Sequence, residues 1–328
     1  MRHTIIFLLV LMVSCTGHQP ERTPIQAFHL SDVTLLDSPF NHAMQVNREY
    51  IMRFNPDRLL APFLREAGLP PKAERYSNWE SSGLDGHTAG HYLTSLSLLY
   101  ASTGDQEALT RLNYMLEELK RCQDQDAEGY VGGIPDGKTI WNEVAKGDIR
   151  AQNFSLNERW VPWYNIHKLF AGLYDAYQYA HLPLAKEILV KLTDWTYNLS
   201  SNLTDEQIQS MLRSEHGGIN EVFANVASIT GEEKYMELAR KYSHHEILNP
   251  LLESTDRLDG LHANTQIPKV IGFKRIADLT NDREWDNATR FFWEAVVMDR
   301  SVSIGGNSVR EHFHPRDNFM PLILCLLY

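Results

Sequence analysis

The sequence has few cysteines, few strand signals and no excess of basic charge. Its 328 residues include 3 cysteines, too few for a disulfide framework or a complete zinc site. Lys and Arg total 31 against 42 Asp and Glu, and the net charge of −11 argues against a nucleic-acid partner. A P-loop, a Rossmann fingerprint and a Gly-x-Ser-x-Gly elbow are also absent. The 43% of hydrophobic residues nevertheless suffices for a large core.

The signal for export lies at the N-terminus. A short basic start precedes the apolar residues 5–13, and Ser14-Cys15 follow, as in a signal peptide. The run is too short to span a bilayer stably. Leu-Met-Val-Ser before Cys15 resembles the lipobox of bacterial lipoproteins, although a plain secretory signal with an incidental cysteine is the alternative. We therefore expect a signal peptide over residues 1–15, a tether over 16–27, and a periplasmic or outer-membrane lipoprotein of a bacterium, anchored only through acylated Cys15.

Helical periodicity dominates from about residue 38 onward. A helix-ending Gly or Asn followed by an acid recurs at Gly104-Asp105, Gly231-Glu232 and Asn281-Asp282, and a related joint lies at His181-Leu182-Pro183. The last two acidic joints are about fifty residues apart, the length of a helical hairpin with its connection, and such a period indicates a repeat architecture. On the period alone, a linear solenoid and a closed ring are both possible.

The joints at one end of the expected hairpins are tight, whereas long polar loops join their other ends. This asymmetry favours an all-α fold, an α/α toroid. We count roughly five helical hairpins over residues 28–328, fewer than the six of a closed toroid, so the ring is expected to be incomplete.

The long loops combine Trp, His, Asn and Glu with glycine, a mixture that ordinary helix connections do not need. Aromatic faces suit the C–H surface of a sugar ring, and amides, imidazoles and carboxylates suit its hydroxyl groups. Because the loops recur at the same point of successive units, we expect them to converge on one cleft. They span residues 78–92, 160–168, 214–221, 260–269 and 305–315.

Glu311 is the candidate catalytic acid. It lies between Arg310 and His312 in a segment that follows Gly305-Gly306, and a carboxylic acid in such a loop could protonate a leaving group. The alternative is a surface glutamate paired with Arg310. The sequence does not rank four further acids against it: Glu80, Asp85, Glu215 and Glu221.

Histidines mark most of the loop–helix junctions. His167 follows an aromatic run, and His216 and His262 each lie beside glycine, so all three are candidates for binding a sugar, with structural hydrogen bonding as the alternative. We expect Asp85, His87 and His91 to hold their loop or to contact substrate hydroxyls, and we count Trp79 with Asp85 and His87 among the substrate-binding candidates. His87 and His91 share a helix face as metal-binding pairs do, but no Glu follows His87 as in zinc proteases.

At these loops the chain resembles the β-L-arabinofuranosidases of glycoside hydrolase families 127 and 146. The resemblance runs from about residue 28 to 319 and includes NWESSGLDGH, GYVGGIPDG, YNIHKLFAGLYDAY, EHGGINEVFA, LHANTQIPKVIGF and GGNSVREHFHP. It implies an α/α six-hairpin barrel, which in the family is followed by β domains, and substrates that contain L-arabinofuranose.

The resemblance also implies a mechanism that cleaves non-reducing-end β-L-arabinofuranosides with retention. A zinc-bound cysteine thiolate attacks the anomeric carbon while a glutamate serves as acid and then as base. Glu311 matches that glutamate, and His167, His216 and His262 match histidines that contact the arabinofuranose.

The family's zinc ligands and nucleophile come from a Glu-Thr-Cys segment and a later Cys-Cys pair, and this sequence has neither. It departs from the family pattern near Met320, and Cys325 lacks the Glu-Thr context. We therefore expect a truncated or frame-shifted copy that lacks the β domains and the metal ligands and is inactive as it stands. The alternatives are a sugar-binding lipoprotein without catalysis, and a toroid-fold sugar epimerase or lyase that uses two histidines or a His/Tyr pair and no zinc.

Overall fold

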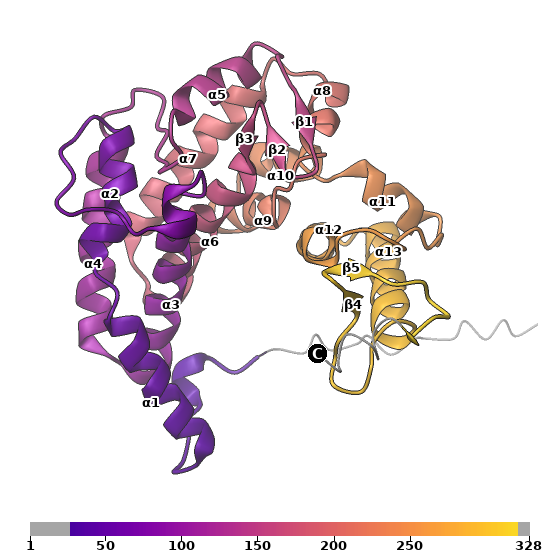
Figure 1. Ribbon diagram of the computed structural model, residues 1–328, viewed down its shortest axis with the longest axis horizontal. Coiled ribbons are helices and arrows are strands. Elements are labelled where there is room, and N and C mark those ends of the chain that lie inside the picture. The colour runs from indigo at the N-terminus through magenta and orange to yellow at the C-terminus, as the bar shows by residue number, and fades with distance from the viewer. Residues whose placement is uncertain (1–26, 321–328) are drawn as a thin grey trace, which may run out of the picture.

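The computed structural model describes residues 27–320, so the predicted signal peptide, lipobox Cys15, most of the tether and Cys325 lie outside the described residues. The helices follow one another around an open ring, from α1 through α6 and α9 to α13 (Figure 1). Within residues 27–320, no helix is both long and apolar enough to cross a bilayer.

Four helical hairpins form most of the ring. The inner helices pack against one another in chain order, and each packs against an outer helix that follows it. The inner helices are α3 (His87–Thr103), α6 (Pro162–Ala180), α9 (Ile219–Thr230) and α12 (Ala263–Thr280). The outer helices are α4 (Gln106–Gln123), α7 (Pro183–Ser200), α10 (Glu233–Lys241) and α13 (Arg283–Trp293).

The predicted tight joints lie between the inner and outer helix of each hairpin. Gly104, His181, Gly231 and Asn281 have φ values of 71°, 56°, 76° and 54°, the left-handed conformation that ends a helix. Asp105 then caps α4 by accepting a hydrogen bond from a backbone N–H of its first turn. The long loops are thereby left at the opposite end of the ring, as expected from the sequence.

Two further helices, α1 (Pro39–Met52) and α2 (Pro56–Glu66), precede these four hairpins. Helix α1 packs against α3, and α2 packs against α3 and α4, in agreement with the expected α/α toroid fold. Ser38 caps α1 as predicted. Shorter helices complete the loops: η1 (Leu30–Asp32), η2 (Asn78–Ser81), α5 (Gly137–Ala145), α8 (Asp205–Met211), α11 (His245–Leu252) and the π-helical η3 (Glu294–Met298).

Two small antiparallel sheets interrupt the otherwise helical architecture. One contains β1 (Ala151–Gln152), β2 (Ser155–Leu156) and β3 (Arg159–Trp160), and the other pairs β4 (Ser308–Val309) with β5 (His312–Phe313). The sequence did not predict them, because two-residue strands are too short to show the alternation that identifies a strand. Both sheets belong to the long loops, and both contribute to the site described below.

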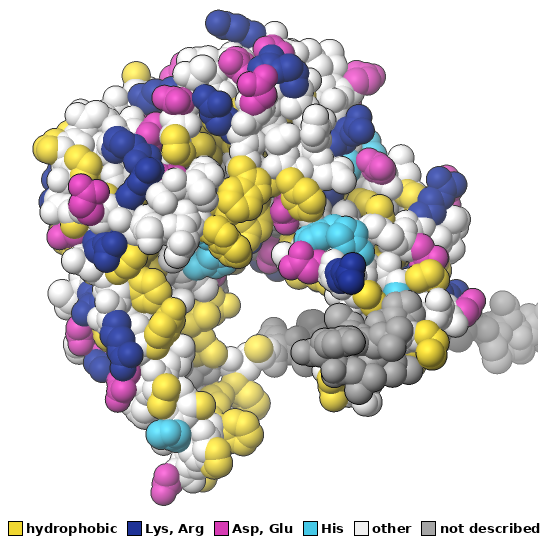
Figure 2. Space-filling view, viewed as in Figure 1, with side chains coloured by type: hydrophobic (Ala, Val, Ile, Leu, Met, Phe, Trp, Pro, Cys, Tyr) yellow, Lys and Arg dark blue, Asp and Glu magenta, His cyan; other side chains and the backbone are white. Residues whose placement is uncertain are grey.

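The core lies between the inner and outer helices. It forms one cluster that extends from α1 to α12 and a smaller one around α11, α12 and α13. Helices α3 and α6 cross closely, because a Cβ on Gly90 would overlap the backbone of Lys168. Helix α1 leaves Phe40, Val46 and Tyr50 exposed. Figure 2 shows the hollow between the two sides of the ring.

Candidate functional site

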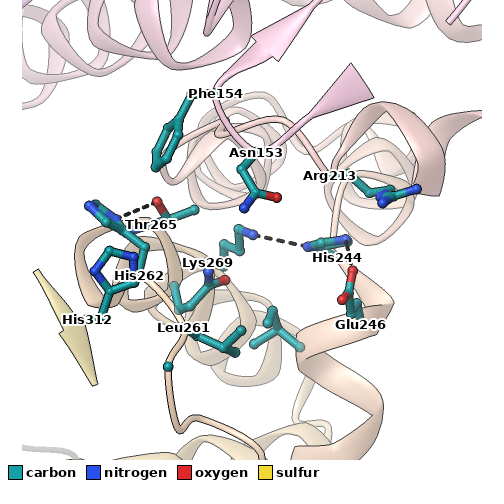
Figure 3. A pocket seen from close by; sticks show the side chains of 13 residues that line it. Asn153, Phe154, Arg213, His244, Glu246, Leu261, His262, Thr265, Lys269 and His312 are labelled. Carbon is teal, nitrogen blue, oxygen red and sulfur yellow. Dashed lines mark hydrogen bonds and ion pairs between the residues drawn. The ribbon is translucent and has the colours of Figure 1, made fainter. Parts of the chain in front are cut away.

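A polar pocket of about 150 Å³ lies at the loop end of the ring, between the first sheet and the start of α12 (Figure 3). It is formed by the β1–β2 turn, the beginning of α11, the loop before α12, the first two turns of α12 and β5. Its lining residues are Asn153, Phe154, Arg213, His244, Glu246, Ile247, Gly260, Leu261, His262, Thr265, Gln266, Lys269 and His312.

Glu311 lies in the two-residue turn that joins β4 to β5. Arg310 and Glu311 have φ values of 47° and 68°, and positive φ at both central positions is what a type I′ hairpin turn requires. Glycine or asparagine normally fills these positions, so the backbone is strained here. The turn is held against the start of α12, because Ala263 N–H donates to the Glu311 carbonyl at 2.7 Å and Phe313 N–H to the Leu261 carbonyl at 2.9 Å.

Glu311 is not itself part of the pocket lining, but its side chain contacts one of the predicted histidines, His262, which is. Its Oε2 lies 3.1 Å from His262 Nε2, while 75% of the side chain remains exposed. The rings of Phe154 and His312 pack in T-shaped geometry against the same imidazole, with centroids 5.4 and 5.1 Å away. The predicted acid and one predicted sugar-binding histidine are therefore in contact.

His216 and His167 lie deeper. His216 Nδ1 hydrogen-bonds to the Ser214 carbonyl at 2.9 Å, and its ring packs 5.8 Å from that of the pocket residue His244. His167 packs against Gly217, whose φ is 59°; a Cβ there would lie 2.5 Å from His167 Nδ1. Burial lowers the pKa of both imidazoles well below the ordinary value, so both are neutral.

Both of these histidines have a buried ring nitrogen without a hydrogen-bond partner. Among the described residues, His167 Nδ1 and His216 Nε2 have no hydrogen-bond partner, and neither does the pocket residue Gln266 through its Oε1. Buried polar atoms are normally satisfied, so Gln266 Oε1, which lies in the pocket lining, marks a place where a ligand or water can bond, whereas neither histidine is part of that lining.

Lys269 and His244 were not among the residues predicted from the sequence. Lys269 is 2% exposed, and its Nζ lies 3.0 Å from His244 Nδ1 (Figure 3). Burial lowers the pKa of Lys269 to about 8 and that of His244 to about 3, so a protonated amine donates to a neutral ring. Lys269 follows His262 by seven residues, which is two helical turns, so this spacing could have predicted that both side chains lie on the same face of the helix. His244 lies in an ordinary connection that carries no such signal.

Glu215 is the alternative acid that lies nearest to this site. It is 8% exposed, and its backbone N–H donates to the Asn153 carbonyl at 2.9 Å. Burial raises the pKa of its carboxyl group, while the neighbouring His262 and Thr265 partly oppose that shift. Burial likewise raises the pKa of Glu221, which follows on α9.

The structure places Trp79, Asp85 and His87 outside the pocket lining. Asp85 is fully buried and pairs with Arg75, and His87 Nδ1 lies 2.7 Å from Glu80 Oε1. Trp79 is 65% exposed and is stacked edge-on against a neighbouring indole. Asp85 and His87 thus hold their own loop in place, which is one of the two roles expected from the sequence.

The zinc–thiolate centre implied by the family does not fit the described residues. Within residues 27–320, no three His, Cys, Asp or Glu side chains converge in a way that could hold a metal ion. Cys122, the one cysteine in this range, is buried in α4, and burial raises its thiol pKa to about 12. No step through zinc or a thiolate is therefore derived from these residues.

The model of the family described as β-L-arabinofuranosidase, GH127 catalytic domain, matches residues 32–322. The chain belongs to this family. No curated protein sequence matches it.

Two solved structures show the same fold in GH127 proteins. A β-L-arabinofuranosidase from Geobacillus stearothermophilus T6 is 16% identical with a TM-score of 0.61, and the match covers 85% of this chain and 47% of that one. The β-arabinofuranosidase BT3674 is 15% identical with a TM-score of 0.58, and the match covers 88% of this chain and 46% of that one. The chain therefore spans less than half the length of either GH127 protein.

Proposed function

We propose that the pocket binds the terminal L-arabinofuranose of an oligosaccharide and that Glu311 is the acid/base residue of this GH127 site. The contact between Glu311 and His262 at the pocket rim carries this proposal. A glutamate in this position can protonate the glycosidic oxygen as the leaving group departs, and can later activate a water molecule.

The pocket offers both kinds of surface that a sugar needs. Phe154, which is 43% exposed, presents an aromatic ring for the C–H face. Gln266 Oε1 offers a buried acceptor for a hydroxyl group. This combination supports binding of a neutral, hydroxyl-rich ligand such as an arabinofuranoside.

We further propose that the described residues bind the sugar without hydrolysing it. A retaining reaction needs a nucleophile on the face of the ring opposite the leaving group. The thiol of Cys122 is buried in α4 outside the pocket lining and remains protonated, so it cannot serve as that nucleophile. A proton donor alone contributes only about 10²–10⁴-fold to a rate.

Calorimetry with L-arabinofuranose oligosaccharides tests the binding. We expect measurable binding that Phe154→Ala weakens about tenfold, the equivalent of roughly 1.4 kcal/mol. Phe40→Ala, which removes an exposed ring from distant α1, should leave the affinity unchanged. An absence of heat with every arabinofuranoside, or an equal loss in both variants, would refute the proposed pocket.

A nitrophenyl β-L-arabinofuranoside assay with added zinc tests the catalytic part. We expect no turnover beyond the buffer rate. Turnover that disappears in Glu311→Gln would overturn the proposal of inactivity and support the role of Glu311. Turnover that persists in that variant would remove Glu311 as the acid/base residue.

We also propose that the protein is exported and anchored through lipid on Cys15. The signal-like residues 5–13 and the lipobox-like sequence before Cys15 support this proposal. Labelling cells with a radioactive fatty acid should mark the wild-type protein but not Cys15→Ala. Equal labelling of both, or a mature protein that starts at another residue, would contradict the anchor.

A further inference from the structure

His262 serves as the N-cap of α12. Its Nδ1 accepts a hydrogen bond from Thr265 N–H at 3.2 Å and lies 2.8 Å from the Thr265 hydroxyl oxygen. Capping groups must be acceptors, because the first N–H groups of a helix have no partner within it. A backbone N–H can only donate, so Nδ1 uses its lone pair here and carries no proton.

This cap fixes the tautomer of the imidazole. The single ring proton of neutral His262 then resides on Nε2, the nitrogen that faces Glu311 Oε2 at 3.1 Å. The Thr265 hydroxyl can give its proton either to Nδ1 or to Glu215, but the backbone donor occupies Nδ1 in either case.

We propose that His262 is a positioning residue for Glu311. By capping α12 through Nδ1, the imidazole presents its Nε2–H to one carboxylate oxygen of Glu311. The other carboxylate oxygen is then free to face the substrate. This inference rests on the proposed role of Glu311 as the acid/base residue. Because the imidazole donates, the hydrogen bond is stronger when Glu311 is a carboxylate, the form it reaches as the leaving group receives its proton.

The backbone around Glu311 supports the same arrangement. Ala263, the first residue of α12, donates its N–H to the Glu311 carbonyl at 2.7 Å, and a β-bridge pairs His262 with His312. Main chain and side chain of Glu311 are therefore both fixed to the start of α12. An acid that is 75% exposed is held in one place although little packs around it.

Nitrogen-15 NMR of histidine-labelled protein, without any sugar, tests the tautomer. The His262 signals, assigned by their loss in His262→Asn, should show a protonated Nε2 and a bare Nδ1 at neutral pH. Glu311→Gln should shift the Nε2 resonance, whereas Arg310→Gln, which alters the same turn without touching the imidazole, should not. A proton on Nδ1, or an Nε2 resonance that does not shift in Glu311→Gln, would overturn the inference.

The variant His262→Asn tests the positioning separately from the fold. Asparagine is a favoured N-cap, so α12 should remain capped and the melting temperature unchanged, but the shorter side chain cannot reach Glu311. We expect the carboxyl carbon-13 resonance of Glu311 to shift in this variant. An unshifted carboxyl resonance in a folded variant would show that His262 does not hold the acid. Since both measurements use sugar-free protein, their failure is distinct from a failure of arabinofuranoside binding.

Discussion

The strained turn that carries Glu311 should be easy to stabilise. Arg310 occupies the first central position with a φ of 47°, and its exposed side chain makes no ion pair among the described residues. Asparagine adopts this conformation several-fold more often than other residues with a side chain. We therefore predict that Arg310→Asn stabilises the protein.

The expected gain follows from the backbone alone. A left-handed conformation at a residue other than glycine or asparagine costs about 1–2 kcal/mol, and asparagine relieves part of it, so the gain is about 0.5–1 kcal/mol. Glycine would relieve more strain, but it also loses about 0.5–1 kcal/mol of backbone entropy on folding. Asparagine therefore tests the backbone strain without this added loss of entropy.

Thermal unfolding followed by circular dichroism measures the effect. For a chain of this length, a gain of this size raises the melting temperature by about 1–2 °C. Arg257→Asn is the matched control, because Arg257 is also exposed but has no positive φ. A melting temperature that falls in Arg310→Asn, or that rises equally in Arg257→Asn, would show that the turn stores no strain.

Three further predictions concern the frame around the site. Gly90→Ala should destabilise the protein by about 3 kcal/mol in urea unfolding, because its Cβ would push α3 away from the Lys168 backbone. Burial lowers the Lys269 pKa from 10.5 to about 8, so between these pH values the unfolded chain binds more protons than the folded protein. The free energy of unfolding should therefore rise with pH in this range, and Lys269→Met should lack that rise. Arg300 is 1% exposed and lies 2.7 Å from Asp256, so Arg300→Met should lower the free energy of unfolding by about 3–5 kcal/mol in the same urea assay. The same substitution at the exposed Arg316 should lower it by less than about 1 kcal/mol.

The repeat could be predicted because its signals are local. Gly104, Gly231 and Asn281 end helices through their own backbone preferences, whatever packs around them. Once those joints are known, the loops must alternate between the two ends of the ring. The contact between Glu311 and His262 then follows from two loops that share one end.

The remaining features depend on contacts between segments that are distant in the sequence. Asp85 stands in a loop typical of sugar binding, but Arg75 occupies its carboxylate, and nothing in the local sequence predicts that pairing. His244 lines the pocket beside Lys269, which comes from a later helix. Tertiary placement of this kind leaves no periodic or motif signal.

The turn at Glu311 explains why a strained conformation and an exposed acid occur together. A buried acid is fixed by packing, but burial also excludes a bulky glycan from its carboxyl group. Here the β4–β5 hairpin carries the acid to the rim, and backbone hydrogen bonds to Leu261 and Ala263 hold it there. The two-residue turn of this hairpin places Arg310 and Glu311 at positive φ, so the strain accompanies an accessible side chain that is fixed through the main chain. Relief of the strain at Arg310 should therefore leave the contact between Glu311 and His262 unchanged.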